Sequence, residues 1–223
     1  MKQRKEPVMW RDAEAVIFDL DGTLVDSMWI WKSVDIDFFG ERGVELPDDL
    51  QGALDGMSFR ETAAYMKNRF GFAETVDELM VIWNEMAHKK YQYEAPLKEG
   101  VLEFLKVLKK NDVKIGIASS NSEFLVRTVL ESHGVFEYFD SIHTANEVEK
   151  GKPAPDIYLL VAKDLQVEPK NCLIFEDIVQ GIMAGKNAGM KTCAIYDHYS
   201  KVDDEKKREV ADYYIMDYKE LLG

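Results

Sequence analysis

Short apolar runs alternate along the chain with longer segments of helical periodicity. Several of the runs show no polar–apolar alternation, which is typical of parallel strands covered on both faces. Each run is short enough for a strand and too short for an average helix. The expected strands are AVIFD (15–19), VKIGIAS (113–119), FDSIHTA (139–145), CLIFED (172–177), TCAIY (192–196) and a less apolar final run, DYYIM (212–216).

Helical spacing fills the intervals between these runs. In 98–110, the apolar residues Val101, Leu102, Leu105 and Leu108 recur at the spacing of one helix face. Further helices are expected over 122–133, 155–166 and 179–188. Strands that alternate with helices predict a doubly wound α/β fold with a parallel sheet.

The segment from 28 to 95 breaks this rhythm, because it contains no strand pattern. Its stretches WIWKSVDIDFFGERG, FRETAAYMKNRFG and VDELMVIWNEMAHKKYQYE carry aromatic residues and methionines at helical spacing. Pro47 and Gly71 mark breaks between helices, and Pro96 marks the return to the core. We therefore expect a helical domain (28–95) inserted into an α/β core (12–27 and 96–223).

Composition and charge narrow the partners. The 223 residues are 46% hydrophobic and 31% charged, as in a globular protein. The net charge of -13 should repel nucleic acid and anionic membranes, so we expect neither as a partner. The same field repels phosphorylated substrates at long range. An anion site must therefore be built locally from a metal ion, a lysine or backbone N–H groups.

Targeting signals and cysteine use point to the cytoplasm. No apolar run approaches the roughly 18 residues of a membrane span, and the basic start MKQRKEPVMWRD lacks the apolar stretch of a signal peptide. Cys172 and Cys193 lie in apolar stretches without CxxC spacing. We expect buried thiols, with a disulfide as the alternative. We also expect a monomer, and a solvated loop or helix face over the charged tail 201–212.

Two aspartates stand where the first strand ends. Asp19 closes the strand, Asp21 follows two positions later, and Gly22 permits a tight turn. Ligands of open α/β sheets bind beyond the carboxyl ends of the strands. Carboxylates this close repel each other unless a hard cation such as Mg²⁺ lies between them. Ordinary turn chemistry is the alternative, with Asp26 and Ser27 capping the next helix.

Three later segments place more polar side chains beyond strand ends. CLIFED ends in an acidic pair, the serines and asparagine after IGIA suit a phosphate at a helix start, and EKGKPAPD offers a lysine. Helix capping could explain the first two segments, and solvation the lysine. Taken together they describe acids for a metal and hydroxyls with a lysine for an anion. The residues are Glu176, Asp177, Ser119, Ser120, Asn121 and Lys152.

The motifs DLDGTLVDS, the serine after IGIA, GKPAPDIY and FEDIVQGIMAGKNAGM together resemble the haloacid dehalogenase (HAD) superfamily. They are most similar to its group that includes β-phosphoglucomutase, phosphoglycolate phosphatase and related sugar-phosphate phosphatases. The resemblance implies a Rossmann-like core, and the insertion matches the family's cap domain in position and length.

The resemblance also implies a role for each motif residue. Asp19 would be the nucleophile that forms an aspartyl-phosphate, and Asp21 the general acid and then the base. Mg²⁺ would bind Asp19, Asp177 and the backbone carbonyl of Asp21, with Glu176 helping directly or through water. Ser119 would bind a phosphoryl oxygen, and Asn121 would line the same pocket. Lys152 would neutralise charge between phosphate and nucleophile. These roles fit phosphoryl transfer, which depends on positioning and charge neutralisation.

The cap separates phosphatase from mutase. Trp31 stands where β-phosphoglucomutases have a histidine, and Asp55 stands where their cap carries a lysine. Trp31 either packs between cap helices or contacts substrate, and Arg60 is either a surface residue or a ligand of the substrate's distal group. We therefore predict a Mg²⁺-dependent phosphatase of a small phosphorylated metabolite, such as a sugar phosphate. A β-phosphoglucomutase-like phosphomutase and a non-catalytic binding protein on the same fold are the alternatives. Metal-free dehalogenase chemistry is disfavoured because Asp21 is present.

Overall fold

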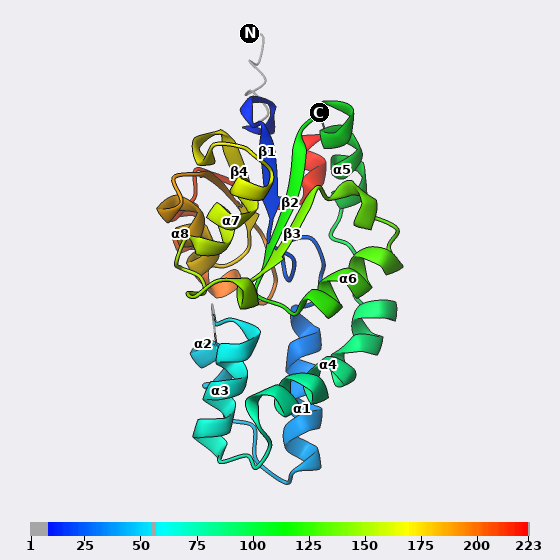
Figure 1. Cartoon of the computed structure of the whole chain (residues 1–223), viewed down its shortest axis with the longest axis vertical. Helices are drawn as coiled ribbons and strands as arrows, with labels where there is room; N and C mark the ends of the chain where they lie inside the picture. The colour runs from blue at the N-terminus through cyan, green and yellow to red at the C-terminus, as the bar shows by residue number, and fades with distance from the viewer. Residues whose placement is uncertain (1–8, 55–56, 223) are drawn as a thin grey trace.

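The computed structural model describes residues 9–54 and 57–222. Its core is one parallel sheet with the strand order β3-β2-β1-β4-β5-β6 (Figure 1). The strand order reverses between β1 and β4, as in a doubly wound sheet, so the predicted fold class is confirmed. The strands are β1 (Ala15–Phe18), β2 (Lys114–Ser119), β3 (Ser141–Thr144), β4 (Cys172–Glu176), β5 (Lys191–Ile195) and β6 (Tyr213–Ile215).

The register brings the ends of the central strands to one edge. Phe18 of β1 lies opposite Ile117 of β2 and Phe175 of β4. The backbone N–H of Asp19 then donates to the Phe175 carbonyl at 3.0 Å, which extends the ladder by one residue. The three strands therefore end within two residues of one another at the same edge of the sheet.

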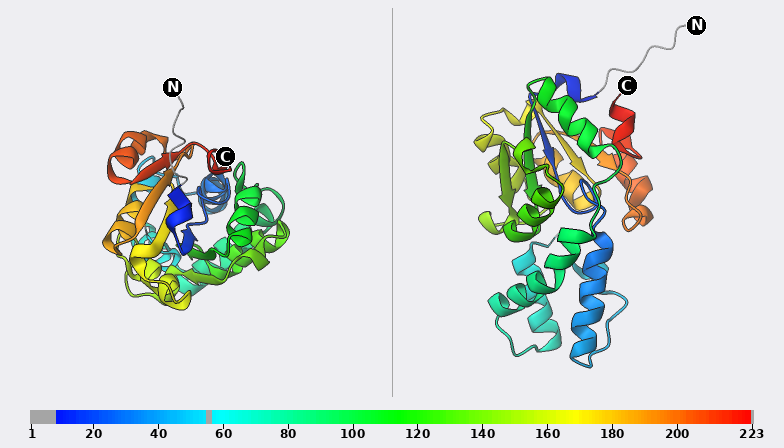
Figure 2. Two further views of the ribbon diagram at one scale, coloured as in Figure 1. Left: turned by 90° about the horizontal axis from the view of Figure 1, so that it is seen from above. Right: turned by 90° about the vertical axis from the view of Figure 1, so that its right-hand side faces the viewer.

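Each face of the sheet has its own apolar core. Val16 and Phe18 point to one face, which is covered by α5 (Val101–Lys110) and α6 (Glu123–Ser132). Ala15 and Ile17 point to the other, which is covered by α7 (Asp156–Asp164) and α8 (Val179–Asn187). Figure 2 shows these two helical layers with the sheet between them. Burial on both faces explains why the strands read as unbroken apolar runs.

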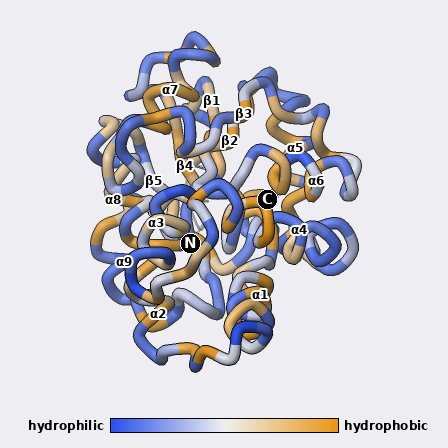
Figure 3. The backbone as a smooth tube through the Cα atoms, turned by 60° about the horizontal axis from the view of Figure 1, so that its bottom comes forward, coloured by the Kyte–Doolittle hydropathy of each residue, from blue (hydrophilic) through white to orange (hydrophobic). Residues whose placement is uncertain are grey.

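The inserted segment forms a helical cap beside the carboxyl edge of the sheet (Figure 1). Its helices are α1 (Met28–Glu41), α2 (Leu50–Leu54), α3 (Phe59–Phe70) and α4 (Val76–Tyr93), and no strand occurs in the described residues of 28–95. Ser58 and Thr75 start α3 and α4 with capping boxes, and Gly71 ends α3 in a left-handed conformation. Along α1 the hydropathy alternates between polar and apolar positions (Figure 3).

Two linkers join cap and core side by side. The N–H of Asp26 donates to the Pro96 carbonyl at 2.9 Å, and the N–H of Lys98 donates to the Leu24 carbonyl at 2.9 Å. Val25 and Leu97 form an antiparallel bridge between the same segments. This pairing supports our proposal that the chain divides into a core (12–27 and 96–223) and a cap (28–95).

The charged tail forms a mostly exposed helix, α9 (Asp204–Val210), which agrees with the expected solvated helix face except at one residue. Lys207 is fully buried, where it pairs with Asp204 at 2.7 Å and donates to Ser200 at 3.1 Å.

Cys172 and Cys193 are free and buried, as predicted. None of the helices in the described ranges is both long and apolar enough to cross a bilayer. Short 3₁₀ turns occur at Met9–Asp12, Phe136–Tyr138, Ala145–Glu147, Pro169–Asn171, Lys201–Asp203 and Tyr218–Leu221.

Two helical glycines should respond oppositely to alanine. A Cβ at Gly185 of α8 would lie 2.1 Å from Ile174 of β4, whereas a Cβ at Gly40 of α1 would meet no atom within 4 Å. We expect Gly185→Ala to lower the free energy of unfolding by about 1–3 kcal/mol through overpacking. Gly40→Ala should raise it by about 0.5–1 kcal/mol through helix propensity. Urea unfolding measures both, and equal effects would contradict the close α8–β4 contact.

Candidate active site

The loop after β1 approaches the end of β4 closely. Gly22 has φ +78°, and its N–H donates to the Val25 carbonyl at 2.9 Å, so the chain turns tightly behind Asp21. A Cβ at Gly22 would lie 2.4 Å from Oδ2 of Asp177. Only glycine therefore allows the Asp177 carboxylate to stand beside the loop that carries Asp19 and Asp21.

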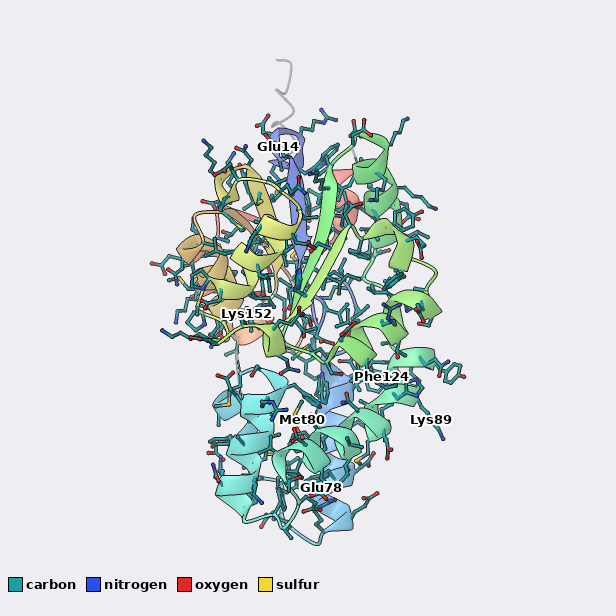
Figure 4. All side chains as sticks on the ribbon, viewed as in Figure 1. Glu14, Glu78, Met80, Lys89, Phe124 and Lys152 are labelled. Atoms are coloured by element: carbon teal, nitrogen blue, oxygen red, sulfur yellow. The ribbon has the colours of Figure 1, made fainter. Side chains whose placement is uncertain are left out.

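Lys152 connects the first motif to the acidic pair of β4. Its Nζ lies 2.7 Å from Oδ1 of Asp19 and 2.5 Å from Oε1 of Glu176, and the residue is only 5% exposed. Burial alone would lower the pKa of Lys152, but the two carboxylates outweigh it and raise the pKa above its ordinary value. The Tyr158 hydroxyl donates to the same Glu176 oxygen at 2.7 Å. The lysine is thus a buried cation at the core edge nearest the cap (Figure 4), and not a solvated loop residue.

Three buried carboxylates converge as a metal site requires. Asp19, Glu176 and Asp177 each place an oxygen within 4.8 Å of the others. Burial, opposed by Lys152 and reinforced by Glu176, raises the pKa of Asp19 to about 7, and burial with Glu176 and Asp19 raises the pKa of Asp177. A divalent cation removes this repulsion, and an all-oxygen set suits Mg²⁺. The residues present therefore fit the ion.

Asp21 is held by hydrogen bonds from three parts of the chain. It accepts from Ser27 Oγ at 2.6 Å, from Asn121 Nδ2 at 2.9 Å and from the Tyr91 hydroxyl. Burial raises the pKa of Asp21, whereas these three hydrogen bonds oppose the rise. Ser27 occupies the N-cap position of α1 but makes no side-chain cap bond. Its hydroxyl thus orients Asp21 instead of capping the helix.

In the segment after β2, one residue caps the next helix and the preceding residues remain available for a ligand. Ser122 caps α6 by accepting from the Leu125 N–H, so capping does not use the preceding residues. Ser119 is buried at the end of β2, where its Oγ accepts from the Asn121 N–H at 3.0 Å. Ser120 and Asn121 line a cavity shared with Asp19, Asp21 and Lys152, whereas Ser119 is not among the described residues of its wall. Its phosphate-binding role stays a prediction.

The cap supplies the opposite wall of this cavity. Trp31 lines it and also packs against Phe59 and Tyr91, with ring centroids 5.5 and 6.0 Å away, so packing and access to a ligand coexist in one residue. Arg60 is exposed, pairs with Asp77 at 2.6 Å and is not among the described residues of the wall. Its role as a substrate ligand stays a prediction. Asp55 lies outside the described residues.

Sequence reasoning did not assign a site role to Tyr91, Tyr158 or Asp35. Tyr91 comes from the last turns of α4 and reaches the core only because the two linkers bring α4 back to the sheet edge. No motif carried that information. Tyr158 lies in the quoted GKPAPDIY stretch, in the helix that follows the lysine loop. Its closeness to Lys152 in the sequence was the available signal that it could reach Glu176.

Comparison with known proteins agrees with the geometry. The family model of the haloacid dehalogenase-like hydrolases matches residues 16–195. This chain belongs to the haloacid dehalogenase-like hydrolases. YhcW of Bacillus subtilis, named as a phosphatase, is 38% identical over 184 residues, which cover 82% of each chain.

Two further proteins extend this comparison. The phosphorylated carbohydrates phosphatase of Thermotoga maritima is 30% identical over 195 residues, covering 86% of this chain and 88% of the other. These relatives confirm the predicted enzyme class, a phosphatase. A crystal structure of CbbY from Rhodobacter sphaeroides in complex with phosphate has a TM-score of 0.83 at 22% identity, covers 94% of this chain and 96% of that chain, and supports the fold.

We predict that the Tyr91 hydroxyl positions Asp21. Tyr91→Phe removes one of three hydrogen bonds to the carboxylate, so kcat with 4-nitrophenyl phosphate should fall about tenfold while KM changes little. Tyr93→Phe, at an exposed residue of the same helix, is the matched control and should leave both constants unchanged. An unaltered kcat in Tyr91→Phe would contradict the role.

Proposed function

We propose that this enzyme is a Mg²⁺-dependent phosphatase that hydrolyses a small phosphorylated metabolite, such as a sugar phosphate, through an aspartyl-phosphate. The observation that carries the proposal is the convergence of Asp19, Lys152 and Asp177 on one cavity. The similarity to a phosphatase of phosphorylated carbohydrates supports the substrate class.

In the first step, a carboxylate oxygen of Asp19 attacks phosphorus. A new O–P bond forms as the bond between phosphorus and the leaving oxygen breaks, and Asp21 gives its proton to that oxygen. Lys152 holds Oδ1 of Asp19 and keeps positive charge beside the transferring group. Its second contact with Glu176 fixes its direction, because both carboxylates pull on one ammonium group.

In the second step, Asp21 is ionised and removes a proton from water. The water oxygen attacks phosphorus, the bond to Asp19 breaks, and inorganic phosphate leaves with the nucleophile restored. The hydrogen bonds from Ser27 and Asn121 favour the ionised form of Asp21, which this step requires.

Mg²⁺ would be held by Asp19, Asp177 and the Asp21 backbone carbonyl, and it would neutralise phosphoryl charge. Glu176 already accepts hydrogen bonds from Lys152, Tyr158 and the Asp177 N–H. Its main role would therefore be to position the other metal ligands, and direct binding of Mg²⁺ would be secondary. No contact among the described residues favours the phosphomutase alternative. We further propose that the protein is cytoplasmic, which agrees with the two buried free thiols. We also propose that it is a monomer.

Asp19→Asn should abolish turnover. The amide cannot act as the nucleophile, so we expect 4-nitrophenyl phosphate hydrolysis to fall by at least ~10³-fold. Steady-state release of 4-nitrophenol measures it, and Asp37→Asn, at an exposed position of α1, controls for charge removal. Asp19→Asn that keeps substantial activity with intact structure would remove Asp19 as the nucleophile.

Metal dependence should run through Asp177. EDTA should stop turnover of the wild type, and added Mg²⁺ should restore it. Asp177→Ala should raise the Mg²⁺ concentration for half-maximal activity at least about tenfold. It should melt no lower than the wild type in EDTA, because it removes one of three mutually repelling buried carboxylates. Glu205→Ala, on the surface of α9, is the control. Unchanged metal dependence in Asp177→Ala would contradict this assignment.

A further inference from the structure

The cap side of the cavity has a wall that the proposed chemistry does not explain. Met28, Trp31 and Asp35 of α1 line it at helical spacing, so they share one face of the helix. With a rise of 1.5 Å per residue, Asp35 lies about 10 Å along the axis from Met28, where the helix leaves the core. This wall therefore surrounds the part of a substrate that is distant from phosphorus.

Most of the cap wall is apolar, with both aromatic and aliphatic side chains. Its one charged member within the described ranges is Asp35. The apolar members are Met28, Trp31, Val34, Leu54, Met57, Phe59 and Trp83. Lys152 is the one cation that the described residues contribute to the whole cavity, and two carboxylates already hold it.

The Asp35 side chain is half-buried in the cap wall. It makes no hydrogen bond or ion pair with any residue of the described chain, and burial raises the pKa of its carboxyl to about 7. Trp83 also has an unsatisfied hydrogen-bond donor, because its indole Nε1 is buried without a partner among the residues described. Unpaired polar groups in an apolar wall reduce stability, so a ligand is a reasonable partner for them.

We propose that Asp35 is a specificity-determining residue that selects a neutral, polyhydroxylated leaving group and rejects a leaving group with a second anion. The proposal rests on the phosphatase function above and assigns the substrate class at the same site. The favoured substrates are monophosphates of sugars or sugar alcohols. Bisphosphates and phosphorylated carboxylic acids are disfavoured.

The contacts available in the wall fit such a leaving group. Sugar hydroxyls can donate to Asp35, and the indole N–H of Trp83 can donate to a sugar oxygen. The C–H faces of a sugar can pack on the rings of Trp31 and Phe59. A second phosphate would instead meet a carboxylate in an apolar environment, with no cation of the described cap wall to compensate.

Competition against 4-nitrophenyl phosphate tests the selection. We would measure inhibition constants of glucose 6-phosphate and glucose 1,6-bisphosphate with the Mg²⁺-loaded enzyme. The monophosphate should bind at least about tenfold tighter, because the bisphosphate brings a second anion to the cap wall. Asp35→Asn should reduce this ratio at least fivefold, and Asp35→Lys should reverse it. Asp37→Asn, exposed on the same helix, should leave the ratio unchanged.

Each outcome decides between separate claims. Equal inhibition by the two sugars, tighter binding of the bisphosphate, or a ratio unaffected by Asp35→Asn would overturn the proposal. If the wild type did not hydrolyse 4-nitrophenyl phosphate at all, that result would instead contradict the proposed phosphatase function.

Thermal melting at pH 8 gives a second test that needs no activity. Asp35→Asn should raise the melting temperature by a few degrees, because it removes a half-buried charge that has no partner among the described residues. A residue retained for structure would behave in the opposite way. A lower melting temperature in Asp35→Asn would show that Asp35 supports the fold and would overturn its assignment as a residue kept for selectivity.

Discussion

The buried ion pair of Lys152 with Asp19 and Glu176 is the interaction on which the active site depends. Three buried carboxylates, from the loop after β1 and the end of β4, lie close together, and this arrangement alone would be strongly unfavourable. A single ammonium group, delivered by the loop before α7, offsets part of that repulsion. The remainder raises the pKa values of Asp19 and Asp177, and a divalent cation would relieve this repulsion as it displaces their protons.

A second set of contacts links the Asp21 carboxylate to the cap. Asp21 belongs to the core loop, yet its hydrogen-bond donors come from the linker, from α4 and from the segment after β2. The cap also contacts that segment directly, since the Phe59 N–H donates to the Ser120 carbonyl at 3.2 Å. A change in cap position would therefore alter the surroundings of Asp21. In the mechanism that we propose, the position of the cap would therefore influence proton transfer by Asp21.

Recognition is divided between the two parts of the cavity. The core edge carries the charges that a phosphate and a metal ion require, whereas the described cap wall is mostly apolar with one carboxylate, Asp35. In the function that we propose, the chemistry would depend on residues at the strand ends of the sheet, and selectivity would depend on residues on the helix faces of the cap.

The sequence by itself determined the strands, the alternation of helices and the core motifs, because burial on both faces of a parallel sheet leaves a distinct apolar pattern and strand ends meet at one edge. It could not determine which residues of the cap reach the core. Tyr91 is 70 positions from Asp21, and Trp31 shows the same helical spacing whether it packs in the cap or lines the cavity. The periodicity of apolar residues indicates which face of a helix is buried, but it does not indicate which part of the protein that face packs against. Only the path of the two linkers and the docking of α4 on the core decide that.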